Sequence, residues 1–247
     1  MRAVLFAPHS DDETLFAAWL IIRHRPIVFV VADDPDPLVA STRRQETVRA
    51  LCCLQPDLSV HFSGLIEGQF DLHDVGREMR KIHGATQVFA PAVEEGGHAE
   101  HNMVGQQAVA VWGEGMTTRY STYTRSGGRT RMGAEVPYRS AWIALKLKAL
   151  SCYRSQHEIP ARAPWFTSMI DLREWVMSQC KTCGAEIRWE TTKAGKKIPL
   201  DMEPAPLGNL FINEGGVVVT WDEDVGRSVP RFYSHFYTCP DAAEHRR

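Results

Sequence analysis

Short β-type runs alternate with segments of helical periodicity over the first 160 residues. The runs at residues 3–7 and 27–31 are entirely apolar, as in strands buried on both faces of a parallel sheet. The expected strands are residues 3–7, 27–31, 59–65, 87–90 and 117–124, and the expected helices are residues 13–25, 42–54, 74–83, 102–112 and 142–153. Ser41 or Thr42 is the expected N-cap of the second helix. This alternation predicts an α/β fold with a doubly wound, mostly parallel sheet flanked by helices.

The pattern changes near residue 160, where prolines precede a short helix expected over residues 171–176. Beyond it, short β-type runs at residues 187–189, 209–212 and 217–221 are separated by glycines and by prolines such as Pro199, which predicts a small β-rich module. We therefore expect a Rossmann-like domain over residues 1–158, a linker with the short helix over residues 159–178, and the β-rich module over residues 179–247. A chain of 247 residues is long enough for one or two domains with real cores.

The first apolar run ends at Pro8, and the polar segment after it carries His9, Asp11 and Asp12. Proline cannot donate to a sheet ladder, so the chain should leave the sheet there. Open α/β sheets bind ligands at the carboxyl ends of their strands, and imidazole and carboxylate groups are zinc ligands. Helix capping by Ser10 or Asp11 is the alternative, which accounts for the acidic residues but not for His9.

A second strand end has similar chemistry, because residues 87–90 meet Pro91 and are followed by His98 and His101. Three residues apart, these histidines can serve one site, and the preceding glycine pair permits close approach of the backbone. Each histidine alone has a structural explanation, and Glu100 is explained as a residue of a helix start. Two strand ends with matching chemistry favour a metal site.

Three protein ligands leave a position open for water, which distinguishes catalytic from structural zinc. We expect His9, Asp12 and His101 to hold a catalytic zinc ion, which lowers the pKa of that water and polarises a carbonyl oxygen. Asp11 adjoins a ligand without being needed as one, so it is the expected general acid-base. His98 would then stabilise the oxyanion. These residues alone allow hydrolysis of any amide.

Both strand-end segments resemble motifs of the PIG-L/LmbE-like zinc-dependent de-N-acetylases. Residues 7–13 (APHSDDE) are similar to the PHPDDE signature of that family, and residues 97–101 (GHAEH) are similar to its GHPDH motif. Weaker similarities are an R-x-x-E helix at residues 43–46 and a closing K-x-x-A-L-x-x-Y-x-S-Q segment at residues 146–156. Ser10 stands where proline is usual, and the family's late E-x-F element has no clear counterpart.

The resemblance implies the same residue roles, with an N-acetylated amino sugar as the substrate, typically N-acetylglucosamine within a larger conjugate. The expected activity is therefore that of a zinc-dependent N-deacetylase, an amide hydrolase that acts on a carbon–nitrogen bond other than a peptide bond.

Cys180 and Cys183 form a C-x-x-C-G knuckle whose paired sulfurs can bind one zinc ion. His235 and Cys239 supply a second pair, with His245 as the alternative to His235. We expect a structural zinc on a module similar to a zinc ribbon. Redox chemistry is the other use of C-x-x-C, but no thioredoxin-like strand precedes this one. The remaining cysteines, Cys52, Cys53 and Cys152, fall within apolar helical patterns and are expected to be buried thiols.

The formal net charge of −2 gives no global attraction to nucleic acid or to an anionic membrane. The alternative function, of a different class, is that of a zinc-ribbon protein that binds nucleic acid or acts as an adaptor. The two functions can also combine, if the ribbon delivers the deacetylase to a sugar-modified macromolecule. A local basic stretch supports nucleic-acid binding: Lys181, Arg188, Lys193, Lys196 and Lys197. No apolar run reaches the length of a membrane span, and the amino terminus does not read as a signal peptide, so we expect a cytoplasmic protein.

Two further polar segments lie outside the motifs. Asp33 and Asp34 follow the second expected strand, where turn formation is favoured over contact with substrate. Arg125, Arg129 and Arg131 lie on a glycine-containing loop, for which a solvated surface position is favoured over a cover that meets an anionic substrate group.

Overall fold

A computed structural model describes residues 2–124, 128, 133–213, 217–220 and 229–246. The chain forms two compact units, unit 1 (Met1–Val176) and unit 2 (Met177–Arg247). Residues 159–176, which we expected in a linker, belong to unit 1 in this division. The helix expected at residues 171–176 is wrong: α7 (Ala163–Met169) begins earlier, with Pro164 in its first turn, where a missing N–H costs nothing. The later residues Trp175 and Val176 begin strand β7 (Trp175–Gln179).

Five parallel strands form the sheet of unit 1, in the order β3-β2-β1-β4-β5. Their bounds are β1 (Ala3–Ala7), β2 (Ile27–Asp33), β3 (Val60–Ile66), β4 (Gln87–Pro91) and β5 (Thr117–Tyr120). The short strand β6 (Ala134–Glu135) pairs antiparallel with the start of β7. The predicted mostly parallel α/β fold is confirmed. The strand order reverses at β1, which lies between β2 and β4, and doubly wound sheets bind ligands at such a point.

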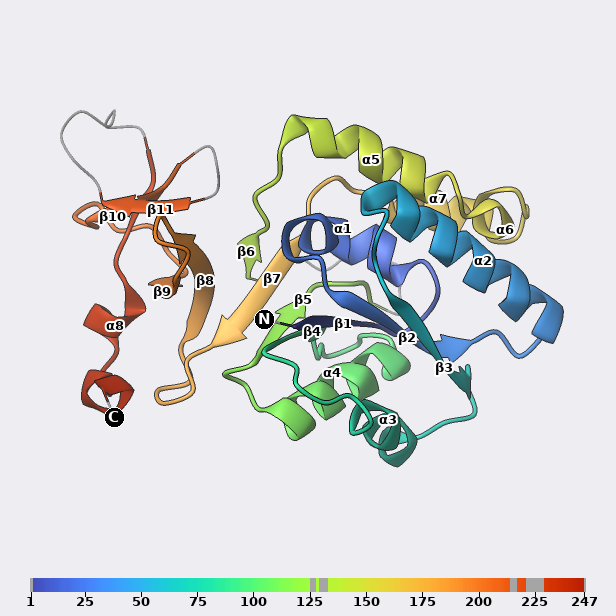
Figure 1. Ribbon diagram of the computed structural model, residues 1–247, viewed down its shortest axis with the longest axis horizontal. Coiled ribbons are helices and arrows are strands. Elements are labelled where there is room, and N and C mark those ends of the chain that lie inside the picture. The colour runs from blue at the N-terminus through green and yellow to red at the C-terminus, as the bar shows by residue number, and fades with distance from the viewer. Residues whose placement is uncertain (1, 125–127, 129–132, 214–216, 221–228, 247) are drawn as a thin grey trace. The chain divides into compact units, whose positions relative to one another are not determined.

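Helices cover both faces of this sheet (Figure 1). On one face lie α1 (Asp12–His24), α2 (Pro37–Leu54), α5 (Ser140–Leu150), α6 (Arg154–His157) and α7, and on the other lie α3 (Leu72–Met79) and α4 (Ala99–Trp112). Side chains alternate along β1 because successive strand residues point to opposite faces. Leu5 and Ala7 accordingly join one core, and Val4 and Phe6 join the other.

Helix α2 corrects two expectations. It begins at Pro37, five residues before the expected start, because the Asp36 carboxylate caps it by accepting the Leu38 N–H at 2.8 Å. Thr42, an expected cap, instead donates its hydroxyl to a carbonyl inside the helix. Cys52 is exposed rather than buried on this helix, and Cys53 is half-buried.

A buried ion pair from outside helix α1 contacts this helix at a bend. The helix bends at Ala17, where φ is −136° and ψ is 17°. A straight helix would join the Leu15 carbonyl to the Trp19 N–H. Here Lys146 Nζ donates to the Leu15 carbonyl at 3.0 Å, and the Trp19 N–H donates to Glu174 Oε2 at 2.9 Å. Lys146 and Glu174 also pair with each other at 2.6 Å, and both side chains are fully buried. The ion pair therefore supplies partners for backbone groups on both sides of the bend.

Unit 2 is a small sheet with short helices. Its elements are the end of β7, β8 (Glu186–Thr192), β9 (Lys197–Asp201), β10 (Leu210–Ile212), β11 (Val217–Thr220), β12 (Arg231–Phe232), α8 (His235–Thr238) and the 3₁₀ helix η1 (Ala242–Arg246). Strand β8 pairs antiparallel with β7 and β9 and parallel with β11, while β10 pairs antiparallel with β11 and β12. The three expected runs fall in β8, β10 and β11, with Trp221 outside the described residues. Pro199 lies inside β9 rather than between strands, at an edge of the ladder, where proline is tolerated.

Within the described ranges, no helix is both long enough and apolar enough to cross a membrane. The expected cytoplasmic location stays a prediction.

We predict that Lys146→Met lowers the free energy of unfolding by about 3–5 kcal/mol, because it leaves the Glu174 carboxylate buried without its cation. Lys148→Met, at an exposed position two residues along the same helix, is the control and should change that free energy by less than about 0.5 kcal/mol. Denaturant unfolding of the full chain, followed by circular dichroism, measures both. Similar losses in the two variants would contradict a stabilising role for the ion pair.

Candidate metal centre and active site

The neighbouring strands β1 and β4 carry the two histidine motifs at their carboxyl ends. After β1, residues 9–12 form the turn into α1, and after β4, His98 is the N-cap residue of α4. Gly105 lets α4 lie close to β4, since a Cβ there would meet the Pro91 carbonyl oxygen at 2.3 Å. His101 is four residues earlier on the same face of the helix, so this close packing also fixes its position.

Three donor atoms converge where the two motifs meet. His9 Nδ1 lies 3.2 Å from Asp12 Oδ2, and His101 Nε2 lies 3.1 Å from the same oxygen. The two ring nitrogens are 3.3 Å apart. All three side chains are buried. The structure therefore brings together the three residues that the sequence analysis selected as ligands.

The spacing of these atoms fits a tetrahedral zinc ion. Ligand nitrogens and oxygens about 2.0–2.1 Å from such an ion lie about 3.3–3.4 Å from one another, close to the separations found here. Two imidazoles and one carboxylate are also a ligand set typical of catalytic zinc. His9, Asp12 and His101 form a candidate metal-binding group.

Outer partners orient both histidines of this group. Glu100 Oε2 lies 2.5 Å from His9 Nε2, and its other oxygen accepts the Gly68 N–H at 2.6 Å. The Thr122 hydroxyl lies 3.0 Å from His101 Nδ1. Such partners fix the ring orientation of metal-binding histidines. Glu100 was expected only as a helix-start residue, because its contact with His9 spans 91 positions and leaves no local pattern.

The electrostatics of the group favour a cation. Burial lowers the pKa of His9, but hydrogen bonds to Asp12 and Glu100 outweigh burial and raise that pKa to about 10. Burial opposes ionisation of Asp12, but the neighbouring histidines hold the pKa of Asp12 far below its usual value. The two acids therefore stabilise positive charge at this point, whether a proton or a metal ion carries it.

Asp11 has an unusual backbone and a poised carboxyl group. Its φ of 113° is one that side-chain-bearing residues rarely adopt, and its side chain makes no capping hydrogen bond to α1. Capping by Asp11 is therefore wrong. The carboxylate instead lies 3.3 Å from Arg43 Nη2, which also donates to the Ser10 carbonyl at 2.6 Å. Burial raises the pKa of Asp11 to about 8, against the opposing charge of Arg43.

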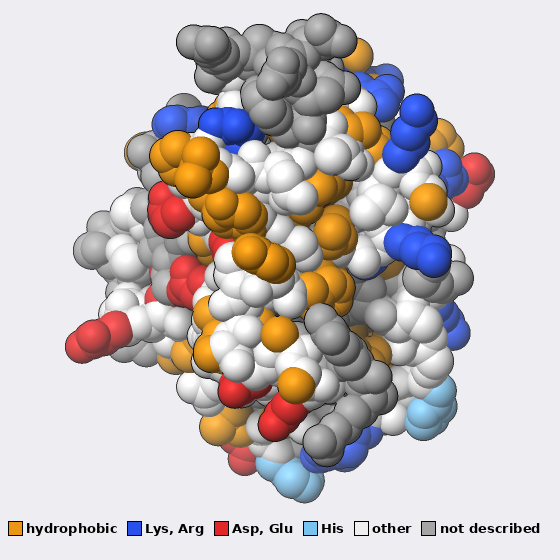
Figure 2. Space-filling view, turned by 90° about the vertical axis from the view of Figure 1, so that its left-hand side faces the viewer, with side chains coloured by type: hydrophobic (Ala, Val, Ile, Leu, Met, Phe, Trp, Pro, Cys, Tyr) orange, Lys and Arg blue, Asp and Glu red, His pale blue; other side chains and the backbone are white. Residues whose placement is uncertain are grey.

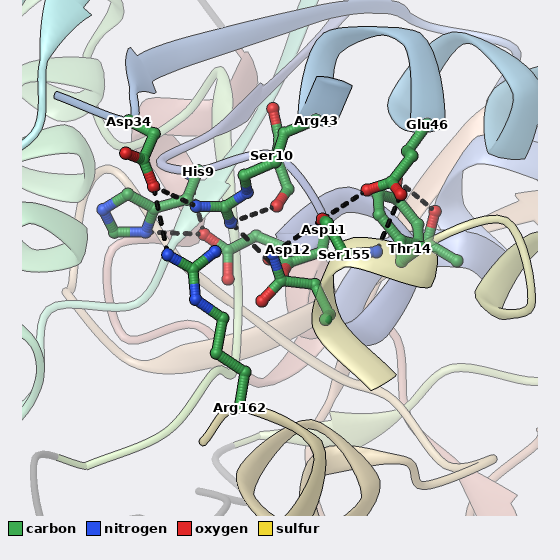
Figure 3. A network of polar contacts seen from close by, with 12 residues as sticks. His9, Ser10, Asp11, Asp12, Thr14, Asp34, Arg43, Glu46, Ser155 and Arg162 are labelled. Carbon is green, nitrogen blue, oxygen red and sulfur yellow. Dashed lines mark hydrogen bonds and ion pairs between the residues drawn. The ribbon is translucent and has the colours of Figure 1, made fainter. Parts of the chain in front are cut away.

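A cavity of about 250 Å³ opens over this group. Its polar lining includes His9, Asp11, Asp12, Asp34, Arg43 and Arg162, which Figure 3 shows gathered in one network. Tyr123 and Trp165 supply an aromatic wall, with ring centroids 5.3 Å apart. The sequence analysis did not select Arg162, Tyr123 or Trp165, because they lie in segments without a motif.

His98 lies beside His9 and His101 but does not line the cavity. Its ring centroid is 5.2 Å from that of His9 and 5.1 Å from that of His101. Burial and the charges of these two histidines lower the pKa of His98 to about 4, so its ring is neutral at pH 7. Its Nδ1 is buried without a hydrogen-bond partner in the described structure. The expected role of His98 at an oxyanion stays a prediction.

Asp34 both forms the expected turn and faces the cavity. One carboxylate oxygen accepts the Asp36 N–H at 3.0 Å, and the other lies 3.3 Å from Arg162 Nη2. Its neighbour Asp33 pairs with Arg44 instead. Arg125, Arg129 and Arg131 lie outside the described residues.

The two weaker sequence similarities meet in space. Glu46, the acidic residue of the R-x-x-E helix, accepts the backbone N–H of Ser155 at 2.8 Å and its hydroxyl at 2.6 Å. This contact joins α2 to the start of α6 beside the cavity (Figure 3).

A second candidate metal-binding group lies in unit 2, made of Cys180, Cys183, His235 and Cys239. The sulfurs of Cys180 and Cys239 are 3.9 Å apart, and Cys183 Sγ lies 3.3 Å from His235 Nε2. Sulfurs about 2.3 Å from a tetrahedral zinc ion lie about 3.8 Å apart, so the spacing fits that metal. No disulfide joins these cysteines.

Two features of this group were not foreseen. The Asp201 carboxylate lies 2.7 Å from His235 Nδ1, which leaves Nε2 facing the cysteines. Burial opposes ionisation of Cys180, but hydrogen bonds to Cys183 and Thr182 outweigh burial and lower its pKa to about 5. Cys180 is therefore a thiolate at neutral pH, the form that binds metals.

The charges of unit 2 are balanced. Residues 177–247 contain nine Lys and Arg and ten Asp and Glu. Arg188, part of the expected basic stretch, pairs with Glu190 at 2.8 Å. On the face drawn in Figure 2, basic side chains lie mostly along the two sides of a band of hydrophobic ones. Binding of nucleic acid by this unit stays a prediction.

No protein-family model matches the chain, and comparison with curated proteins gives no match. Among solved structures, the chain is similar to GalB, the 4-carboxy-2-hydroxymuconate hydratase from Pseudomonas putida, with 14% identity and a TM-score of 0.52 over 71% of this chain and 95% of GalB. It is also similar to the conserved protein TT1542 from Thermus thermophilus, with 17% identity and a TM-score of 0.50 over 74% of this chain and 96% of TT1542. At these identities the likeness concerns the fold alone.

We predict that Glu100→Gln weakens zinc binding by roughly 10- to 100-fold at the His9 group, because the ring of His9 loses its carboxylate partner. Glu95→Gln, at an exposed position, should leave zinc affinity unchanged. Competition titration with a chromophoric chelator measures both. Unchanged affinity in Glu100→Gln would exclude the orienting role.

For unit 2, the double change Cys180→Ser, Cys183→Ser should reduce the zinc content of purified protein from two ions per chain to one, because serine hydroxyls are poor ligands for this metal. Cys52→Ser, at an exposed position outside both groups, should retain two ions. Elemental analysis gives the count, and two retained ions in the double variant would refute the cysteine site.

Proposed function

We propose that unit 1 is a zinc-dependent hydrolase of the PIG-L/LmbE-like de-N-acetylase family, which removes the acetyl group from an N-acetylated amino sugar of the N-acetylglucosamine type. The main support is the convergence of His9 Nδ1, Asp12 Oδ2 and His101 Nε2 at 3.1–3.3 Å beside a cavity. These three residues would hold the zinc ion. Zinc at such a site supplies Lewis acidity toward a carbonyl group and a bound water.

The residues around the metal-binding group have distinct roles in this proposal. Asp11, which lines the cavity and adjoins the proposed ligand Asp12, takes a proton from the attacking water and delivers it to the leaving amine. Arg43 holds the Asp11 carboxylate in place through its contact at 3.3 Å. His98, whose neutral ring adjoins those of His9 and His101, would donate a hydrogen bond to the oxygen that becomes negative when water attacks the acetyl carbon. This role requires the ring of His98 to turn toward the cavity, which it does not line in this structure. Tyr123 and Trp165 give the sugar ring an apolar surface.

A second candidate reaction is the addition of water to a carboxylated double bond. GalB, which has a similar fold, is a hydratase of 4-carboxy-2-hydroxymuconate. The two arginines at the cavity suit a carboxylated substrate. Hydration and hydrolysis both need an activated water, so the same site could serve either reaction. Only the products formed distinguish the two reactions.

For unit 2 we propose a structural zinc held by Cys180, Cys183, His235 and Cys239 in a zinc-ribbon-like module. Four protein ligands leave no open position, which suits stability rather than catalysis. A nucleic-acid or adaptor role for this module is the alternative function. It requires a binding surface beyond the balanced charges of residues 177–247.

Release of acetate from a panel of N-acetylglucosamine conjugates by the zinc-loaded protein tests the deacetylase. Loss of ultraviolet absorbance from a conjugated hydroxymuconate tests the hydratase in parallel. Acetate release without hydration supports the first function, and hydration without acetate release replaces it with the second. Protein inactive in both assays that binds oligonucleotides tightly would favour the adaptor.

Asp11→Asn should lower kcat for acetate release by roughly 10²- to 10⁴-fold, the usual size of a general acid-base contribution, while zinc content stays unchanged. Asp57→Asn, at a residue whose side chain is 86% exposed, should behave as the unmodified protein. Steady-state kinetics with parallel metal analysis measures both quantities. Loss of zinc from Asp11→Asn would make Asp11 a ligand instead.

A further inference from the structure

Two guanidinium groups line the cavity, together with the carboxylates of Asp11, Asp12, Asp34 and Glu67. Arg43 extends from α2, and Arg162 extends from the residue before α7 (Figure 3). Between them lies Asp34, with one oxygen 3.9 Å from Arg43 Nη1 and 3.3 Å from Arg162 Nη2. The two positive groups therefore share Asp34, while Arg43 also pairs with Asp11 at 3.3 Å.

Both arginines keep unused hydrogen-bond donors. Arg43 is occupied at Nη2 by the Ser10 carbonyl and Asp11, while its Nε is buried with no hydrogen-bond partner among the described residues. Arg162 contacts Asp34 through Nη2, while its Nη1 is likewise buried and unpartnered in the described structure. A buried donor without an acceptor costs about 1–3 kcal/mol, so two such donors on residues that line one cavity favour binding of an acceptor there.

We propose that Arg43 and Arg162 form a subsite for an anionic group, phosphate or carboxylate, carried by the substrate. The inference rests on the proposed function in assigning this group to an amino sugar. The planar fork of arginine matches both anions with paired hydrogen bonds. Asp34 reduces repulsion between the two cations, and Asp11 offsets Arg43, so the donors of the two forks rather than a surplus of positive charge would select the anion.

A purely structural role accounts for part of this arrangement. Arg43 fixes the turn that carries Asp11, and this use alone would explain its burial. Arg162 touches neither that turn nor the metal-binding group in any hydrogen bond of the described structure, and its side chain remains 37% exposed. Substitution of Arg162 therefore tests binding of an anion without disturbing the turn that carries Asp11.

Calorimetric binding to the full-length protein tests the subsite without turnover as a readout. The probes are N-acetylglucosamine, N-acetylglucosamine 6-phosphate and N-acetylmuramic acid, which are neutral, phosphorylated and carboxylated. The unmodified protein should bind at least one anionic probe roughly tenfold or more tightly than the neutral one. The better of the two anionic probes identifies the anion. This preference should fall as ionic strength rises.

Arg162→Gln should bring the affinity for the anionic probe close to that for the neutral sugar, with the neutral affinity unchanged. Arg162→Lys keeps the charge but not the fork, and should retain part of the preference. Arg154→Gln, on the neighbouring helix α6 with an exposed side chain, should retain all of it. If Arg162→Gln unfolds, as judged by circular dichroism, Arg162→Lys and the salt dependence decide the question.

Equal affinity for charged and neutral probes in the unmodified protein, or no binding of either anionic probe, would overturn the subsite. A preference that survives Arg162→Gln in folded protein would also overturn it. Failure of the proposed function is a separate result: anion preference without acetate release refutes the deacetylase and leaves the subsite standing. Acetate release without anion preference does the reverse.

Discussion

The buried pair of Lys146 and Glu174 is the interaction on which the geometry of unit 1 depends. Lys146 reaches the Leu15 carbonyl and Glu174 accepts the Trp19 N–H, so the bend in α1 leaves neither group without a partner. Two charges in a dry interior are tolerated only when they are paired and their remaining hydrogen-bonding capacity is used. Helix α1 begins at Asp12, and its course therefore determines how the turn after β1 meets β4.

The topology of the sheet brings the residues of the site together. The strand order reverses at β1, so the turns after β1 and β4 lie on either side of one crevice. Residues 92 positions apart, His9 and His101, come within 3.3 Å of each other as a result. Close packing at Gly105 fixes the position of α4, and the contacts of Glu100 and Thr122 fix the ring orientations of His9 and His101. The site is thus organised by backbone and hydrogen bonds before any ligand binds.

Sequence periodicity was sufficient to predict the parallel α/β fold, and strand-end chemistry was sufficient to select His9, Asp12 and His101, which the structure brings together. Prediction from the sequence failed for residues whose role depends on a partner distant in the chain. Glu174 lies in a segment without periodicity, and only the fold brings it to Lys146. Arg162 has no motif around it, so its place at the cavity became visible only with Asp34. Local rules also competed, as when Asp36 and Pro37 started α2 before the expected caps.

Asp11 combines two demands that oppose each other. Its φ of 113° is a conformation that glycine adopts without strain, while any side chain there raises the free energy of the folded state. The turn nevertheless carries a carboxylate at this position. At this residue the backbone favours glycine, whereas the proposed reaction needs a carboxylate. A search for more stable variants would therefore select against Asp11. Improvement of stability at this turn would remove the group that the proposed reaction needs.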